Sequence, residues 1–167
     1  MNYTIISGTG RQDSHTFKVS ELYLELLSEK GINANLFSLH QYKTIERTPE
    51  FLLAQTKLLI PAEKFIIISP EYNGSYPGVL KSMIDISDTR NVWNGKKVLL
   101  TGVSSGRAGN LRGMDHLTGV LNYMKCIVHP NKLPISVIDK LTDSSGKIND
   151  VETLLAIDLQ LVEFISF

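Results

Sequence analysis

Short apolar runs alternate with stretches of helical periodicity along the chain, and this alternation restricts the possible folds most strongly. The runs that predict strands are residues 3–6, 34–37, 64–68, 97–103 and 126–128. Those at 64–68 and 97–103 are apolar on both faces, as central strands of a parallel sheet must be. Five strands separated by helical segments predict an α/β fold in which helices cover both faces of an open parallel sheet.

The intervals between these runs carry helix signals. Residues 19–27 place apolar side chains on one helix face, and Ser14 could cap that helix. Other helices are predicted at 48–60, from residue 77, around 117–124 and from residue 151. Residues 130–134 and 141–149 are predicted as loops. Because the chain shows no linker or internal repeat, residues 1–167 are expected to form a single domain.

The composition excludes several classes of protein. Seventeen basic residues balance seventeen acidic ones, so the chain is a poor candidate for binding nucleic acid through its phosphates. Cys126 is the single cysteine, which excludes an internal disulfide and a thiolate zinc site, and the four histidines lack metal-binding spacing. No apolar run has the length of a membrane span, and the first residues do not resemble a signal peptide. A cytoplasmic location without membrane contact is expected.

The loops that follow the strongest strands are rich in small polar residues. Ligands of such sheets bind beyond the carboxyl ends of the strands. The first loop, residues 7–16, combines glycines, hydroxyls, Arg11 and a helix start, which suits a phosphate group. A tight turn with a helix cap explains the same residues equally well. Since the loop lacks the lysine of a Walker motif, a nucleoside triphosphatase is disfavoured.

The second and third loops would lie at the same edge of the sheet. In residues 69–78, tyrosines offer flat surfaces and Asn73-Gly74 favours a turn with positive φ, which suits a planar heteroaromatic ring. Taken alone, this loop is explained more simply as a turn before a helix. Residues 104–110 offer donors, glycines and Arg107, and the alternative explanation is a flexible connection to the next helix. Three such loops together are harder to dismiss.

The second loop carries a resemblance to a known family. Residues 70–85, PEYNGSYPGVLKSMID, resemble the P-E-Y-N-x-S-x-P-G-x-L-K-N-x-I-D stretch of the NAD(P)H-dependent FMN reductases, flavodoxin-like proteins that include quinone, azo-dye and chromate reductases. In the first loop, Gly8, Thr9, Arg11 and Ser14 resemble the family's G-S-x-R-x-x-S-x-N pattern. Residues 93–97, WNGKK, resemble the W-x-G-K lead-in to the fourth strand.

This resemblance implies a fold, cofactors and a site. The fold is a flavodoxin-like three-layer sandwich whose five-stranded parallel sheet has the order 2-1-3-4-5. The cofactor is FMN, and NADPH or NADH is the co-substrate. The residues implied to bind FMN come from all three loops: Thr9, Arg11, Ser14, His15, Thr16, Pro70, Glu71, Tyr72, Asn73, Gly74, Ser75, Ser104, Ser105, Gly106, Arg107 and Gly109. Tyr72 and Arg107 are also expected to shape the substrate site.

The implied function is an oxidoreductase in which hydride passes from the nicotinamide to N5 of the flavin and on to a small acceptor. That acceptor could be free flavin, a quinone, an azo compound or a similar molecule. The cofactor carries this chemistry, so no catalytic side chain and no metal are expected. Helices at 77–87 and 111–124 are implied to form a homodimer or homotetramer. Two alternatives remain open: a flavodoxin-like electron carrier without a nicotinamide site, and a flavin-free regulatory module.

Overall fold

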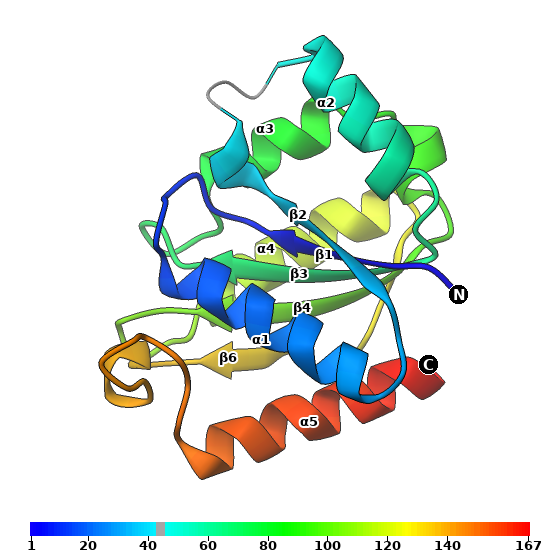
Figure 1. Ribbon diagram of the computed structural model, residues 1–167. Helices are drawn as coiled ribbons and strands as arrows, with labels where there is room; N and C mark the ends of the chain where they lie inside the picture. Colours follow the sequence, from blue (N-terminus) through cyan, green and yellow to red (C-terminus); the bar gives the residue numbers. More distant parts are fainter. Residues whose placement is uncertain (43–45) are drawn as a thin grey trace.

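The computed structural model describes residues 1–42 and 46–167 (Figure 1). The strands are β1 (Tyr3–Ser7), β2 (Ala34–Ser38), β3 (Lys64–Pro70), β4 (Lys97–Val103), β5 (Ile127–Val128) and β6 (Leu133–Ile135). The α-helices are α1 (His15–Glu29), α2 (Pro49–Ala54), α3 (Gly78–Ile86), α4 (Leu111–Tyr123) and α5 (Val151–Ser166). The predicted strand–helix alternation is thereby confirmed.

All strand pairs are parallel, and the sheet has the order β2-β1-β3-β4-β5, as expected from the family resemblance. A sixth strand also pairs with β4. Lys97 pairs with Ile127 of β5 at the start of β4, whereas Val103 pairs with Ile135 of β6 at its end. Two short, separate strands therefore pair with the outer edge of β4: β5 at its start and β6 at its end.

Three local predictions need correction. The predicted loop 130–134 is wrong at its end, because Pro134 lies in β6. A proline can occupy an edge strand when its position needs no N–H to bond to the neighbouring strand. The predicted helix 48–60 is α2 followed by a π-helical turn, Gln55–Leu59. The third strand continues through Pro70, beyond the predicted 64–68.

The sheet separates two hydrophobic cores. On one face, the buried side chains of α1 and α5, such as Tyr23, Leu27 and Phe164, pack against Ile66 of β3 and other strand residues. On the other face, α2, α3 and α4 cover the sheet (Figure 1). Every residue of β1 and β3 is buried, as the two-sided apolar runs predict for central strands.

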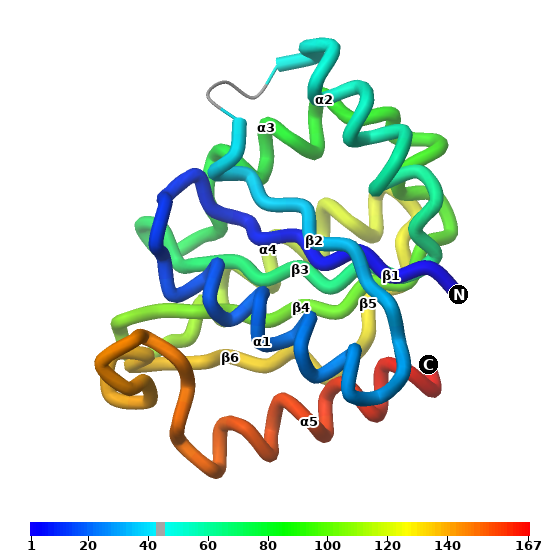
Figure 2. Tube along the Cα trace, viewed as in Figure 1, coloured from blue at the N-terminus to red at the C-terminus, as the bar shows by residue number. Residues whose placement is uncertain are grey.

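The strands point in one direction, so their carboxyl ends share one edge of the sheet. Figure 2 shows the loops after β1, β3, β4 and β6 at that edge, and both chain ends at the opposite edge. The loops that the sequence marked as polar are therefore brought together, and β6 adds the segment that follows Ile135. Within the described ranges, 1–42 and 46–167, no helix combines the length and apolar character that crossing a membrane requires.

Candidate functional site

The first loop leaves β1 through a close backbone contact. The Gly8 N–H donates to the Ile68 carbonyl at 2.8 Å, and a Cβ on Gly8 would lie 3.0 Å from that oxygen and 3.0 Å from Leu80 Cδ2. Glycine is favoured here because any side chain would press against the Ile68 carbonyl and Leu80. The loop then turns at Asp13, whose φ of 52° is positive, and enters α1.

The start of α1 presents a row of donors. The Ser14 Oγ caps the helix by accepting from the Phe17 N–H at 3.1 Å, as the sequence predicts. The N–H groups of the first turn, those of His15 and Thr16 among them, have no intrahelical acceptor, and a helix start of this kind suits an anion. The positive end of the helix dipole adds to the attraction for an anion.

The second loop contains the predicted sharp turn. Asn73 and Gly74 have φ values of 52° and 76°. On either side of them, the backbones of Tyr72 and Ser75 exchange hydrogen bonds of 2.8 and 3.1 Å. An Asn-Gly pair favours this two-residue turn because both residues tolerate positive φ.

The third loop is fastened to the second by Asn110, a residue that the site prediction omitted. Its fully buried side chain donates to the Ser69 and Pro70 carbonyls at 3.0 and 2.9 Å. Its backbone N–H donates to the Glu71 carboxylate at 3.2 Å. Asn110 has a φ of 61°, a conformation that asparagine tolerates better than most residues. These bonds hold the loops after β3 and β4 at a fixed separation.

Two adjacent cavities lie between the loops. One, of about 320 Å³, is lined by the first loop together with Pro70, Glu71, Tyr72, Ser104 and Ser105. The other, of about 420 Å³, is lined by Asn73, Gly74 and the third loop through Ala108. Glu71, Ser104 and Ser105 line both. The structure thus brings together all the predicted FMN-binding residues except Ser75 and Gly109.

Those two residues have other partners. The Ser75 hydroxyl shares a 2.9 Å hydrogen bond with Nδ1 of His116 on α4. Gly109 has a positive φ of 56° and packs against Pro134 of β6, where a Cβ would approach to 2.6 Å. Ser75 and Gly109 therefore shape the loops, and neither lines the two cavities described above.

Tyr72 joins the first and second loops. Its hydroxyl lies 3.0 Å from Thr9 Oγ1, and the Arg11 guanidinium lies 4.5 Å from the centre of its ring. This stacking places Arg11 beside the first cavity, which it also lines. A cation held at this position can approach an anion bound at the start of α1.

One side of the first cavity was not foreseen from the sequence. Ile138 lines it, and the neighbouring Asp139 accepts a 3.0 Å hydrogen bond from Nε2 of His15. Both belong to a 3₁₀ turn, Ile138–Lys140, that follows β6. Since residues 130–134 resemble a loop, the sequence carried no signal that this turn would reach the sheet edge.

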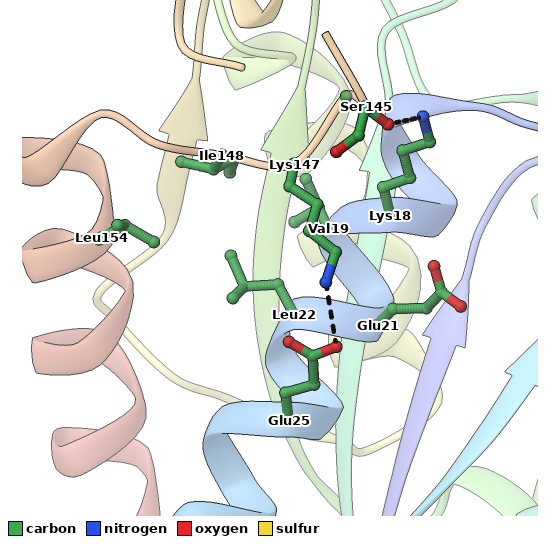
Figure 3. A pocket seen from close by; sticks show the side chains of 10 residues that line it. Lys18, Val19, Glu21, Leu22, Glu25, Ser145, Lys147, Ile148 and Leu154 are labelled. Carbon is green, nitrogen blue, oxygen red and sulfur yellow. Dashed lines mark hydrogen bonds and ion pairs between the residues drawn. The ribbon is translucent and has the colours of Figure 1, made fainter. Parts of the chain in front are cut away.

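A third cavity, of about 480 Å³, lies away from the strand ends. Figure 3 shows it between α1 and residues 145–148, with Leu154 of α5 on one side. It is bordered by an ion pair of 3.8 Å between Lys147 and Glu25. Because none of the predicted site residues line it, this cavity is not part of the candidate site.

Comparison with known proteins identifies the family. Residues 1–138 match the family model described as NADPH-dependent FMN reductase. The chain belongs to this family. The NADPH-dependent FMN reductases are oxidoreductases that use FMN and NAD(P)H, which confirms the enzyme class and the cofactors expected from the sequence.

Named relatives agree with this assignment. A 2-hydroxy-1,4-benzoquinone reductase from a Burkholderia species is 31% identical over 109 residues, which are 63% of this chain and 60% of the relative. An NAD(P)H-dependent FMN reductase from Pseudomonas aeruginosa is 31% identical over 146 residues, which are 83% of this chain and 74% of the relative. The match thus spans less than two thirds of the first relative's length.

The fold also matches solved structures. The flavoenzyme NAD(P)H:(acceptor) oxidoreductase FerB from Paracoccus denitrificans superposes with a TM-score of 0.78 at 21% identity, over 99% of this chain and 95% of that one. A flavodoxin from the domain Archaea superposes with a TM-score of 0.61 at 12% identity, over the whole of both chains. At these identities the likeness shows a flavodoxin-like fold.

The residues at the sheet edge fit FMN. The first cavity has the donors that a phosphate needs. His15 is one of its lining residues, and the Nδ1 atom of His15 is covered by protein and has no hydrogen-bond partner among the described residues. The Asn73-Gly74 turn and the third loop border the second cavity, which Glu71 also lines. Each cavity falls in the range of about 300–1,000 Å³ that is common for cofactor sites.

Proposed function

We propose that this protein is an NAD(P)H-dependent, FMN-containing oxidoreductase that reduces a small organic acceptor of the quinone or flavin class. The observation that carries the proposal is the pair of adjacent cavities at the carboxyl edge of the sheet. The first cavity is rich in groups that can donate hydrogen bonds to a phosphate. The second cavity is bordered by turns and small residues that leave access for a flat ring. The quinone reductase and FMN reductase among the relatives support this choice of acceptor.

In this proposal each loop has a separate task. Arg11, Ser14, His15 and Thr16 bind the FMN phosphate together with the first N–H groups of α1. The second and third loops hold the ribityl chain and the edges of the ring. Hydride transfer from NAD(P)H through N5 is the chemistry that FMN supplies when it is bound.

The protein itself contributes binding and orientation, and no side chain is required as acid or base. Tyr72 would border the substrate position at the junction of the loops. The exposed Arg107 of the third loop would meet a phosphate of the nicotinamide nucleotide. We further propose that the 167 residues form a single domain, that α3 and α4 form a dimer or tetramer interface, and that the protein works in the cytoplasm.

The visible spectrum and steady-state rates of the purified protein test this function. Oxidation of NADH and NADPH would be measured with FMN bound and with riboflavin, benzoquinone and an azo dye as acceptors. Acceptor-dependent turnover is the expected result. A protein that binds FMN but does not oxidise either nicotinamide would be an electron carrier, and one that stays colourless after FMN is added would be a flavin-free module.

A further inference from the structure

The last helix, α5, carries a stripe of exposed apolar side chains, which we call the α5 stripe. Its members Val151, Leu155, Leu159 and Val162 are 65%, 61%, 57% and 50% exposed. At about 100° per residue, they lie within about 80° of one another around the helix axis. The buried residues of α5 lie on the opposite side of the helix and pack into the core. The helix is therefore apolar on both sides, and the described residues cover only one of them.

Few charges accompany the α5 stripe. A surface helix usually carries polar side chains opposite its buried side. The charged residues of α5 are Glu152, Asp158 and Glu163, and all are acidic. Asp158 is paired with Lys30, and the Glu163 carboxylate accepts a 2.6 Å hydrogen bond from the Asn131 side chain. A partner can therefore cover the middle of the stripe without burying an unpaired carboxylate.

The apolar surface continues from α5 toward α1. The third cavity lies between these helices, and Figure 3 shows its apolar wall, which is formed by Val19, Leu22, Ile148 and Leu154. A small polar ligand needs converging polar groups for its orientation, whereas Lys147 and Glu25 at the rim of this cavity are paired with each other. The cavity therefore suits an aliphatic side chain of a partner surface, because anchors of an interface commonly fill such recesses.

The order of residues in the α5 stripe favours a second copy of this chain as the partner. A two-fold interface joins the same patch of both copies, so that patch must be complementary to itself. In an antiparallel pair of α5 helices, Val151 lies opposite Val162 of the partner subunit, and Leu155 lies opposite Leu159 of the partner subunit. Side chains of equal size meet along the whole stripe. The positive end of each helix dipole also lies beside the negative end of the other.

The area needed by a stable dimer sets the extent of the interface. Val151 and Val162 are eleven positions apart, which is about 16 Å along the helix. An apolar patch of this kind supplies a few hundred Å², whereas a stable interface covers about 800 Å² on each partner. The apolar wall of the third cavity continues the stripe, so α1 and residues 145–148 supply further area.

We propose that the α5 stripe and the apolar wall of the third cavity form a two-fold interface between two copies of this chain, with their α5 helices antiparallel. α1 and α5 cover one face of the sheet and α3 and α4 cover the other (Figure 1). This interface is therefore separate from the one proposed above for α3 and α4. If both form, four copies assemble as a dimer of dimers. α5 lies beyond residues 1–138, so the match to the family model does not imply this interface.

A lipid surface is the other covering that an apolar stripe could meet. Helices that lie on membranes are typically rich in Lys and Arg on their polar side, because these residues attract anionic headgroups. All charged residues of α5 are acidic, so anionic lipids would repel this helix. The charges thus favour a second copy of the chain over a membrane.

Light scattering of the full-length chain after size-exclusion chromatography tests the interface. The wild type should have the mass of two or four chains. The double variant Leu155→Lys/Leu159→Lys gathers like charges at the centre of the interface. It should halve this mass and raise the dissociation constant at least about 100-fold. Leu53 of α2 is 56% exposed and lies outside the interface, so Leu53→Lys should keep the wild-type mass.

Both positions of the double variant are exposed, and lysine is a good helix former, so its fold should be preserved. Circular dichroism of the double variant and the wild type checks this. The spectra should agree while the masses differ.

Disulfide formation tests the antiparallel arrangement independently. Two cysteines can be bridged only when their Cα atoms lie within about 7 Å. The double variant Val151→Cys/Val162→Cys should therefore form a covalent dimer under mild oxidation. Val151→Cys alone should not, because its two copies lie about 16 Å apart along the paired helices. The native Cys126 is buried and should not contribute.

The proposal is overturned if the wild type has the mass of one chain at high micromolar concentration, whether or not it binds lipid vesicles. It is also overturned if Leu155→Lys/Leu159→Lys keeps the wild-type mass. Cross-linking of Val151→Cys alone, or its absence in Val151→Cys/Val162→Cys, would exclude the antiparallel pair. None of these measurements uses a flavin, so a failure of the proposed function would leave their results unchanged.

Discussion

At the scale of single residues, Arg11 is the clearest test of the phosphate site. Its guanidinium stacks on Tyr72 and lines the first cavity. Arg11→Ala should weaken FMN binding about 10- to 100-fold, because a charge-assisted hydrogen bond is worth about 1.5–3 kcal/mol. Riboflavin affinity should change much less. The exposed Arg90, outside both cavities, provides the matched control: Arg90→Ala should bind FMN like the wild type.

Cys126 gives a second prediction at this scale. Burial raises the pKa of its thiol to about 12, and Sγ donates to the Trp93 carbonyl at 3.1 Å. The folded protein thus keeps a proton that the unfolded chain releases above about pH 8.5. The free energy of unfolding therefore does not depend on this thiol below about pH 8.5, and it falls as the pH rises above that value.

Alkylation measures this difference. With iodoacetamide at pH 9, Cys126 should react slowly in the folded protein and rapidly in urea. Equal rates in the two states would contradict the burial of the thiol. Because Cys126 is the single cysteine, the modified fraction reports on this position alone.

At the scale of elements, a buried polar group joins α1, β4 and α5. The Tyr23 hydroxyl lies 2.6 Å from Gln160 Oε1 and 2.8 Å from Thr101 Oγ1. The Gln160 amide donates to the Leu100 and Asn131 carbonyls at 3.1 and 2.9 Å. These carbonyls lie in the gap between the residues of β4 that pair with β5 and those that pair with β6. Gln160 therefore supplies the donors that a continuous strand would have provided.

This network predicts unequal costs for two substitutions. Gln160→Leu should lower the free energy of unfolding by about 3 kcal/mol, because several buried groups lose their partner. Tyr23→Phe should cost only about 1 kcal/mol, since Thr101 and Gln160 still bond to each other at 3.0 Å. Urea denaturation measures both values. A larger cost for Tyr23→Phe would contradict this account of the gap between β5 and β6.

At the scale of the whole molecule, cofactor and fold should be thermodynamically linked. FMN at 100 times its dissociation constant should stabilise the protein by about 2.7 kcal/mol, because it binds the folded state alone. For a chain of this size, the melting temperature should rise by about 5–10 °C. Riboflavin at the same concentration should give a smaller rise. A calorimetric melt without any shift would contradict binding at the sheet edge.

The same melt tests the single domain. Both hydrophobic cores use the strands of one sheet, so neither can unfold while the other keeps its packing surface. We expect one cooperative transition whose calorimetric enthalpy equals the van't Hoff enthalpy. Two separate transitions would contradict the proposal that residues 1–167 are one domain.

The parts of the fold that depend on local sequence were predictable. Apolar runs with two buried faces, such as β3, can be satisfied only inside a covered parallel sheet. Ser14 and the Asn73-Gly74 turn were also predictable, because capping and positive φ depend on the residue itself and its neighbours. Since parallel strands place their carboxyl ends at one edge, the approximate position of the site followed from the same pattern.

The tertiary structure alone decided which residues meet across that edge. Proline-rich residues 130–134 resemble a loop, and Leu133–Ile135 becomes β6 only because β4 offers unpaired backbone groups beyond β5. That pairing carries Asp139 to His15, 124 residues earlier in the chain. Asn110 likewise has its role because β3 and β4 are neighbours. Such contacts depend on chain packing at long range, which the spacing of residues along the sequence does not record.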